Sequence, residues 1–359
     1  MREGARHVAI DARYLKRPDV GIGVYLSGLV DDIAARGHRV TLLTDDRDHA
    51  AALARSRGVT AVALRMRTDF LWEQVAAARW AWRERPDVLL AGANHGLPLV
   101  ARRGVRRVQV AYDLIPLRFA SLYRRFGVVW FGRYLVSTAI SLLVARAVIA
   151  ISRSTARDVR RLGARGVVVR RPPPPRPSGD GDGPPPGWPR RYLLYNGGRD
   201  PRKNVPRLLE AFARHRRRGG DHALVLMGRG YEDLLPAAAE LGVRDAVVLT
   251  GYVDEETKGR GIAACAALVY PSRWEGWGLP VMEGLAAGVP VVCGRGGALA
   301  EVGGDAVHAV DVDSAAAIAD GIARAVTPDA RERARADGPR RIGELEAEAT
   351  DDWVDALTG

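Results

Sequence analysis

The chain has 359 residues, of which 47% are apolar and 27% charged, and this length and composition fit about two globular domains and exclude global disorder. Its net charge is +12, but residues 1–180 carry +17 (32 Lys and Arg against 15 Asp and Glu), whereas residues 181–359 carry −5 (22 against 27). The two cysteines, Cys265 and Cys293, argue against a disulfide framework or a zinc site and favour a reduced, cytoplasmic environment.

Short apolar segments alternate with helical segments along the whole chain. In the first half we predict strands at 7–14, 38–44, 87–92, 107–114 and 147–152 and helices at 25–36, 72–83 and 128–145. In the second half we predict strands at 191–198, 222–228, 247–252, 267–272 and 291–294 and helices at 205–217, 231–241, 257–266 and 281–287. This alternation predicts parallel sheets with right-handed crossovers. We therefore expect an α/β protein of two doubly wound, Rossmann-like domains that face a central cleft, the default ligand site.

Two further segments bear on domain organisation and membrane contact. Residues 172–189 (PPPPRPSGDGDGPPPGWP) predict a Pro/Gly-rich linker. The apolar run between Arg133 and Arg146 has twelve residues, well short of the roughly 20 that cross a bilayer, and the polar N-terminus shows no secretory signal. Residues 117–146 mix arginines with aromatic residues, which is typical either of an interfacial helix on anionic lipid or of a helix packed on the first sheet.

The segment Tyr270–Val292 (YPSRWEGWGLPVMEGLAAGVPVV) carries the clearest chemical pattern. A strand ends, a Gly-rich loop follows, and Pro280 opens a helix, so backbone N–H groups lie where an anion can bind. Glu275, in the loop, and Glu283, expected in the first helical turn, suit hydroxyl groups, because an ionised carboxylate accepts hydrogen bonds from a diol. The pattern favours a nucleotide sugar. The alternative leaves Glu283 as a partner of the helix dipole and Glu275 as a solvated loop charge.

The chain resembles the retaining GT-B glycosyltransferases of family four from residue 8 to about residue 326. The spacing of Glu275 and Glu283 matches the E-x7-E signature of that family. Other matching segments are DARYLKRPDVGIGVYLSGL (11–29), AYDLIPLRF (111–119), YNGGRDPRKNVPRLLEAF (195–212), LVLMGRG (224–230) and GGALAEVGGDA (296–306). Several motifs in the proper order are far more specific than a single Gly-rich loop.

The resemblance implies roles for the residues that bind the donor. Glu275 is expected to contact the hydroxyls of the donor sugar, Glu283 the ribose diol, and Lys203 the diphosphate. The amides of Gly276, Trp277, Gly278 and Leu279 are expected at the distal phosphate. Further donor-binding positions are Gly228, Tyr252 and Val253.

The cation that accompanies Lys203 departs from the family pattern. The family often has an arginine directly after the strand-end glycine, where this chain has Gly198, with Arg199 one residue later. Arg202, directly beside Lys203, is the alternative partner for the diphosphate. A solvated Arg/Lys run remains the simpler explanation for these residues.

The N-terminal half contributes five candidate positions. Tyr112-Asp113 stands where many relatives have His-Asp. Tyr112 either donates a hydrogen bond to a sugar hydroxyl or has no such role. Asp113 either takes part in the site or caps the following turn. His95, after a strand end, either faces the acceptor or is a turn residue. Gly21 and Gly23 are expected in a loop after the first strand, where the backbone either approaches a ligand or makes a simple turn.

Two D-x-D sequences raise the question of a metal ion. Asp311-Val312-Asp313 precedes Ser314 and a predicted helix at 315–326, where Asp and Ser serve as caps, and Asp180-Gly181-Asp182 lies in the linker. We therefore expect neither a divalent metal nor another cofactor. Cationic side chains and helix N-terminal amides are expected to stabilise the departing diphosphate.

The resemblance also assigns the domains. Residues 1–171 form the acceptor-side domain, 172–189 the linker and 190–341 the nucleotide-sugar domain. Relatives send their C-terminal helix back onto the first domain, and we expect residues 342–359 to do the same, with Trp353, Val354 and Leu357 on one helical face. A frayed terminus is the alternative.

The leading prediction is a metal-independent retaining glycosyltransferase that moves a hexosyl-type sugar from a nucleotide-diphosphate sugar to a hydroxyl or amine of a small-molecule, saccharide or lipid-linked acceptor. The changes at Tyr112 and Gly198 leave open a catalytically impaired protein that only binds nucleotide sugars. Nucleic acid is not an expected partner, because the basic half has no aromatic-interleaved basic motif. A cytoplasmic location is expected, and peripheral contact with an anionic membrane remains open, as do the donor, the acceptor and the oligomeric state.

Overall fold

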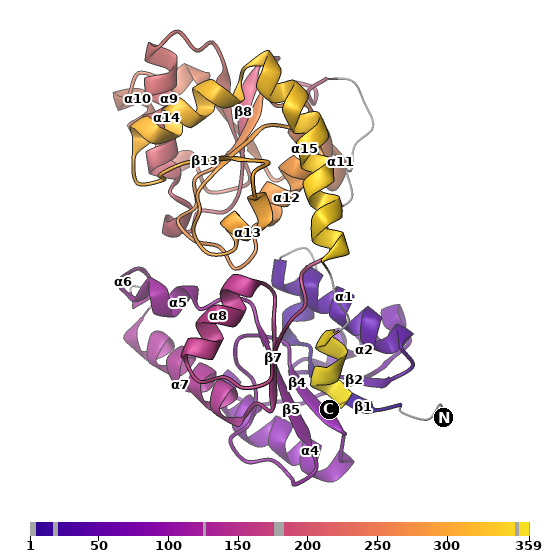
Figure 1. Cartoon of the computed structure of the whole chain (residues 1–359). Coiled ribbons are helices and arrows are strands. Elements are labelled where there is room, and N and C mark those ends of the chain that lie inside the picture. The colour runs from indigo at the N-terminus through magenta and orange to yellow at the C-terminus, as the bar shows by residue number, and fades with distance from the viewer. Residues whose placement is uncertain (1–4, 17–20, 125–126, 176–182, 349–351, 359) are drawn as a thin grey trace. The chain divides into compact units, whose positions relative to one another are not determined.

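The computed structural model describes residues 5–16, 21–124, 127–175, 183–348 and 352–358 (Figure 1). The chain divides into two compact units, of which unit 1 comprises Met1–Pro172 with Thr350–Gly359 and unit 2 comprises Pro173–Ala349. Each unit contains one parallel sheet. Within the described residues, no helix combines the length and the hydropathy that crossing a bilayer requires.

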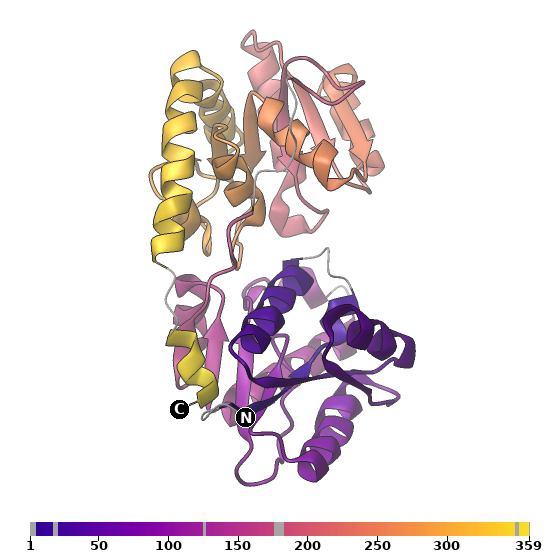
Figure 2. The same cartoon turned by 90° about the vertical axis from the view of Figure 1, so that its right-hand side faces the viewer.

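Unit 1 is built on a seven-stranded sheet in the order β3-β2-β1-β4-β5-β6-β7. The strands are β1 (His7–Asp11), β2 (Arg39–Thr44), β3 (Thr60–Ala63), β4 (Val88–Ala91), β5 (Arg106–Ala111), β6 (Ala147–Ala150) and β7 (Val167–Val169). The helical segments are η1 (Arg13–Lys16), α1 (Gly21–Ala35), α2 (Arg47–Arg57), α3 (Asp69–Leu71), η2 (Trp72–Ala77), α4 (Ala78–Glu84), α5 (Ile115–Arg118), α6 (Ala120–Tyr123), α7 (Val128–Val144) and α8 (Arg153–Arg161). The strand order reverses between β1 and β4, which places helices on both faces of the sheet (Figure 2).

Unit 2 has a six-stranded sheet in the order β10-β9-β8-β11-β12-β13, which reverses between β8 and β11. Its strands are β8 (Tyr192–Asn196), β9 (Ala223–Met227), β10 (Val247–Gly251), β11 (Ala267–Tyr270), β12 (Val291–Cys293) and β13 (His308–Ala309). Its helical segments are η4 (Pro201–Lys203), α9 (Val205–Arg217), η5 (Glu232–Leu234), α10 (Leu235–Glu240), η6 (Arg244–Ala246), α11 (Glu255–Ala264), α12 (Leu279–Ala286), α13 (Leu299–Gly303), α14 (Ala315–Ala325) and α15 (Pro328–Ala347).

The predicted doubly wound α/β architecture is confirmed, and the elements that sequence analysis missed are short or weakly apolar. In α2 only Ala50 and Leu53 are buried, and the side chains of the short edge strands β3 and β7 are mostly half-buried. Helix α15 continues through Pro339, although proline removes a helical hydrogen bond. It packs on α12 with small residues, and Gly338 lies so close to the backbone of Leu285 that a side chain would not fit.

The C-terminal segment joins unit 1, but it begins later than the expected residue 342, because α15 extends to Ala347 within unit 2. After it, η7 (Asp352–Val354) contacts β7, and α16 (Asp355–Thr358) contacts β5 and β6 (Figure 1). Trp353 and Leu357 are buried, and the guanidinium groups of Arg36 and Arg170 lie over the Trp353 ring. These contacts fix the end of the chain on the sheet of unit 1.

The predicted linker is described only in part, because residues 176–182 lie outside the described residues. At its end, Trp188 packs edge-to-face on Tyr192 with 5.6 Å between ring centroids. A Cβ atom on Gly261 would lie 2.7 Å from the Trp188 ring, so Gly261 provides the space for this side chain. The last residues of the Pro/Gly-rich segment are therefore part of the packing of unit 2.

Candidate functional site

The candidate donor site lies in unit 2 where the strand order of the sheet reverses. There, β8 and β11 are neighbours, and the segments that follow them leave the sheet at its carboxyl edge. Asn196 is the last residue of β8, Gly197 to Lys203 follow it, and Pro271 to Gly278 connect β11 to α12. Open α/β sheets bind ligands at such a switch point. The segments that carry Lys203, Glu275 and Glu283 therefore converge at the position where the fold itself predicts a ligand.

The Glu275 carboxylate is held by three donors on one of its oxygens. Oε1 accepts hydrogen bonds from the Tyr270 hydroxyl (2.7 Å) and the Ser272 hydroxyl (2.8 Å), and it lies 2.5 Å from Nη1 of Arg202. The residue is buried. Because all the hydrogen bonds that the described residues make to this carboxylate go to Oε1, the second oxygen, Oε2, remains for a ligand.

Arg202 and Lys203 are adjacent in η4 but have different environments. The Arg202 guanidinium donates through Nη1 to the Trp274 carbonyl (2.7 Å) and pairs with Glu275, so it helps to position that carboxylate. Burial lowers the pKa of Arg202, but Glu275, Tyr270 and Asp200 together outweigh burial, so the net effect is a raised pKa. Lys203 lies with Nζ 5.8 Å from the centre of the Tyr270 ring, and no acceptor for its ammonium group is found among the described residues. Burial lowers the pKa of Lys203.

The loop before α12 offers unpaired N–H groups. Gly278 is the N-cap of α12 with φ +118, and a Cβ atom there would lie 2.8 Å from Leu299. Across the described part of the chain, no acceptor is found for the N–H groups of Gly276, Trp277, Gly278 or Leu279. The Trp277 side chain is buried and donates to the sulfur of Met282, so any ligand contact of this residue involves its backbone.

Two glycines of a neighbouring loop shape this segment. A Cβ atom on Gly296 would lie 1.7 Å from the Arg273 carbonyl oxygen, and one on Gly297 would lie 2.1 Å from that of Glu275. Gly297 also has φ +67, which few other residues adopt. Glycine at these two positions therefore lets this loop pack directly against the backbone of Arg273 and Glu275.

Glu283 accepts two hydrogen bonds inside the site. Its Oε2 accepts from Nδ2 of Asn196 (2.6 Å), and its Oε1 accepts from Nζ of Lys258 (3.1 Å). Burial raises its pKa, and Lys258 opposes this shift. The residue lies beyond the first turn of α12, which holds no acidic side chain, so it is not the expected first-turn partner of the helix dipole. Its half-buried position between two donors fits a binding role better than a dipole role.

The remaining donor-site candidates lie on nearby loops. Arg199 forms an ion pair with Asp233. Gly228, at the end of β9, has φ +120 and pairs with Gly251. Tyr252 is exposed with Arg229 over its ring, and Val253 is half-exposed.

Of the two D-x-D sequences, the described residues include only Asp311-Val312-Asp313. Asp311 accepts from the backbone of Asp313, and Asp313 pairs with Arg273 at 2.8 Å. Asp180 and Asp182 lie outside the described residues. In the described ranges, no three His, Cys, Asp or Glu side chains gather in a way that would hold a metal ion.

Two N-terminal candidates turn out to serve the fold of unit 1. Tyr112 is 4% exposed, and its hydroxyl donates to the Gly92 carbonyl at 3.0 Å, so the side chain does not offer the hydrogen bond to a sugar that we considered for it. It packs edge-to-face on Tyr25. Asp113 accepts from the N–H of Ile115 at 3.0 Å, which is the capping alternative.

Gly21 and Gly23 are also placed differently from our expectation. Both lie in the first turn of α1 rather than in a loop, because the apolar helix begins at Gly21. Residues 17–20, immediately before them, lie outside the described residues. Because Gly21 and Gly23 are helical, the conformational freedom that glycine has in a loop does not apply to them.

His95 belongs to a buried charge cluster at the switch point of unit 1. Its Nδ1 is 2.7 Å from Oε1 of Glu73, and Nε2 is 3.4 Å from the Tyr14 hydroxyl. Glu73 also accepts from Arg13 (3.2 Å) and from Ser137 (3.0 Å). Burial alone would raise the pKa of Glu73. The contacts of its carboxylate with His95 and Arg13 outweigh burial, so the net effect is a lowered pKa. The Glu73 carboxylate thus accepts the hydrogen bond of the proton on Nδ1 and fixes the orientation of the His95 ring.

Sequence analysis missed several residues of both clusters. In unit 2 these are Asn196, Lys258, Tyr270 and Ser272, and in unit 1 they are Arg13, Tyr14, Glu73 and Ser137. Three signals were present. Asn196 lies in the predicted strand 191–198, directly before its two glycines. Tyr270 and Ser272 stand within five residues of Glu275, and Glu73 is an acid in the predicted helix 72–83.

Comparison with known proteins bears on both units. A family model described as "Glycosyltransferase Family 4" matches residues 20–175, and one described as "Glycosyl transferases group 1" matches residues 187–341. O-antigen chain mannosyltransferase B of Escherichia coli is 40% identical over 155 residues, which are 41% of this chain and 40% of that protein.

A second relative and one solved structure complete the comparison. A GDP-mannose-dependent alpha-(1-6)-phosphatidylinositol monomannoside mannosyltransferase of Mycolicibacterium smegmatis is 36% identical over 128 residues, 32% of this chain and 34% of that protein. The matches thus span about two fifths or less of the length of these curated relatives. HepE of Anabaena, solved with UDP-glucose, superposes with a TM-score of 0.70 at 14% identity and covers 98% of this chain and 100% of that one.

The two family models between them account for most of both units, and the solved structure shares the fold over nearly the whole chain. The chain belongs to the GT-B glycosyltransferases of family 4.

Proposed function

We propose that this glycosyltransferase is a metal-independent, retaining enzyme that moves a hexosyl-type sugar from a nucleotide-diphosphate sugar to a hydroxyl or amine of a small-molecule, saccharide or lipid-linked acceptor. One observation carries the donor assignment: Lys203 is a half-buried cation without an acceptor among the described residues, in the same cluster as the buried carboxylate of Glu275 and the half-buried carboxylate of Glu283. A donor diphosphate supplies the missing negative charge. The names of the relatives make GDP-mannose and UDP-glucose the first donors to test.

Each side chain of the donor site has a role in this proposal. Glu275 accepts a hydrogen bond from a donor-sugar hydroxyl through Oε2, while Arg202 and Tyr270 hold Oε1. Glu283 accepts from the ribose diol. Lys203 and the N–H groups of the loop before α12 bind the diphosphate.

The reaction proceeds on one face of the donor sugar. The acceptor atom forms its bond to the anomeric carbon on the face from which the diphosphate leaves, and the departing phosphate oxygen takes the acceptor proton. Negative charge grows on the diphosphate as the carbon–oxygen bond breaks, so Lys203 and the loop amides act most strongly in the transition state. In unit 1, His95 is the side chain that we expect to face the acceptor.

The test is donor turnover without an acceptor. The protein is incubated with GDP-mannose or UDP-glucose, and release of the nucleoside diphosphate is measured with and without EDTA. We expect slow hydrolysis of one donor, at a rate that EDTA leaves unchanged. Binding of the donor without any release supports the alternative of a non-catalytic nucleotide-sugar protein, and strong inhibition by EDTA contradicts metal independence.

A second prediction separates binding from chemistry at Glu283. Because the ribose is unchanged by the reaction, Glu283→Gln is expected to weaken donor binding about 10–100-fold through loss of charge-assisted hydrogen bonds. The hydrolysis rate at saturating donor is expected to stay near that of the wild type. Glu240→Gln, an exposed change on α10, is the matched control. A large fall in the saturated rate with unchanged affinity contradicts the ribose assignment.

A further inference from the structure

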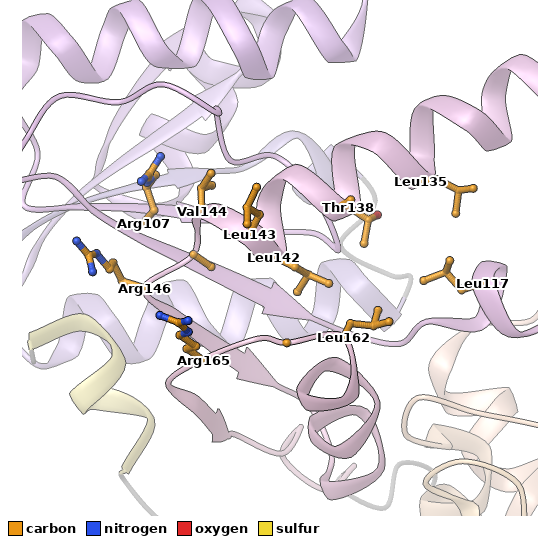
Figure 3. Close-up of a pocket in the computed structure, with 13 residues that line it drawn as sticks. Arg107, Leu117, Leu135, Thr138, Leu142, Leu143, Val144, Arg146, Leu162 and Arg165 are labelled. Atoms are coloured by element: carbon orange, nitrogen blue, oxygen red, sulfur yellow. The ribbon is translucent and has the colours of Figure 1, made fainter.

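A groove in unit 1 is not part of either charge cluster. It has a volume of about 970 Å³, within the usual range of ligand pockets, and lies between the C-terminal half of α7 and the end of α8 (Figure 3). Its walls are mostly aliphatic and include Leu117, Leu135, Leu142, Leu143 and Leu162. The groove is therefore shaped for an apolar chain.

Three arginines stand together at one end of this groove. Figure 3 shows Arg107, Arg146 and Arg165 grouped beyond Val144, at the opposite end from Leu117 and Leu135. They lie at the amino ends of β5, β6 and β7, away from the carboxyl edge that carries Tyr112 and His95. This end of the groove is thus separate from the edge where the chemistry of the unit is expected.

The arginine group lacks acidic partners. In the described ranges, no carboxylate forms an ion pair with any of the three guanidinium groups. Burial lowers the pKa of Arg107, and the positive charge of Arg146 lowers it further. Residues 101–171 contain sixteen arginines and only two acidic residues, Asp113 and Asp158. The charge around the groove is therefore complementary to an anion.

The outer face of α7 continues the apolar surface. Val129, Val136 and Leu143 are 77%, 51% and 79% exposed, and their spacing of seven residues places them in one stripe along the helix. The helix has no acidic residue. This apolar stripe spans about 21 Å. An acidic protein partner could pair with the arginines, but that pairing would not explain why the stripe is apolar and exposed.

We propose that this groove and the α7 stripe bind the surface of an anionic phospholipid bilayer. The phosphate of a lipid lies among Arg107, Arg146 and Arg165, and its acyl chain lies on Leu142, Leu143 and Leu162. A bilayer presents an anionic and an apolar layer side by side, which matches arginines beside an apolar stripe. This inference does not depend on the proposed reaction, because none of the residues that it uses belongs to either charge cluster.

The test is sedimentation of the whole protein with vesicles of phosphatidylcholine, with or without phosphatidylglycerol. We expect binding to the anionic vesicles only, weakened by salt. Arg146→Glu combined with Arg165→Glu is expected to lower the partition coefficient at least about 20-fold. Leu143→Asp is expected to lower it as well. All three side chains are exposed, so thermal unfolding midpoints should stay close to that of the wild type.

The matched control reverses the same number of charges elsewhere in the unit. Arg47→Glu combined with Arg55→Glu changes two exposed arginines of α2, beside the opposite edge of the sheet, and should retain most of the binding. Equal losses in both double variants overturn the proposal, because net charge alone then explains the binding. Binding of monomeric lysophosphatidylglycerol without binding of vesicles also overturns it, since the groove is then a site for single amphiphiles.

Discussion

Replacing Lys203 by methionine is expected to stabilise the unliganded protein and to remove most of its activity. Lys203 is half-buried, its ammonium group has no acceptor among the described residues, and burial lowers its pKa. Methionine fills a similar volume without the cost of burying a charge. In turnover, the loss of a positioned charge at the departing diphosphate should lower kcat on the order of 10²- to 10³-fold.

The pH dependence of stability gives this prediction a second measurement. A lowered pKa means that the folded protein holds fewer protons than the unfolded chain between that pKa and the ordinary value of 10.5. The unfolding free energy attributable to Lys203 therefore rises with pH across that interval and is least favourable below it. Urea unfolding at neutral and alkaline pH should show this rise in the wild type and its loss in Lys203→Met.

Lys16→Met is the matched control for both measurements. Lys16 is partly exposed and pairs with Asp45 at 2.7 Å, so its replacement should leave kcat unchanged and should not stabilise the fold. A Lys203→Met protein with wild-type turnover would transfer the diphosphate contact to another cation. A Lys203→Met protein less stable than the wild type would show that the ammonium group is satisfied in the unliganded state.

Removing the charge of Glu275 is expected to damage the fold and the reaction for separate reasons. Glu275→Gln leaves the mostly buried side chain of Arg202, 13% exposed, opposite a neutral side chain. Loss of one partner of a buried ion pair typically costs about 3–5 kcal/mol of unfolding free energy. Turnover should also fall, because the proposed contact with the donor sugar loses its charge.

A double variant separates the two effects. Glu275→Gln with Arg202→Met removes both charges, so most of the lost unfolding free energy should return, while turnover stays low. Denaturant unfolding and donor hydrolysis measure the two quantities. Recovery of turnover together with stability would mean that Glu275 acts only by holding the loop, and the sugar contact would have to be reassigned.

Part of the donor site was predictable because its chemistry is encoded locally. Glu275, the glycines after it and Pro280 follow a strand within a few residues, so strand, loop and helix place them without knowledge of distant contacts. The same holds for the doubly wound fold, since alternating buried strands and helices leave few topologies. Short edge strands and α2 escaped because they bury few apolar residues.

The choice among neighbouring cations was not predictable from sequence. Asp200 caps η4, and Asn204 closes it with φ +63 and donates to the Val312 carbonyl, 108 residues away. This turn directs Arg202 to Glu275, while Arg199 reaches Asp233. Likewise, the contact of Asn196 with Glu283 joins residues 87 positions apart. Such partners are set by tertiary packing, on which a local pattern carries no information.

Unit 1 consists of two separate stretches of chain. Recombination between relatives therefore cannot exchange a whole unit with a single crossover in the linker. A hybrid with one crossover near residue 172 would combine the first sheet of one parent with the terminal η7 and α16 of the other. The pocket that Arg36 and Arg170 form around Trp353 would then have to accept a foreign side chain. An exchange of donor specificity between relatives therefore calls for two crossovers, near residues 172 and 350, that move unit 2 as an insert.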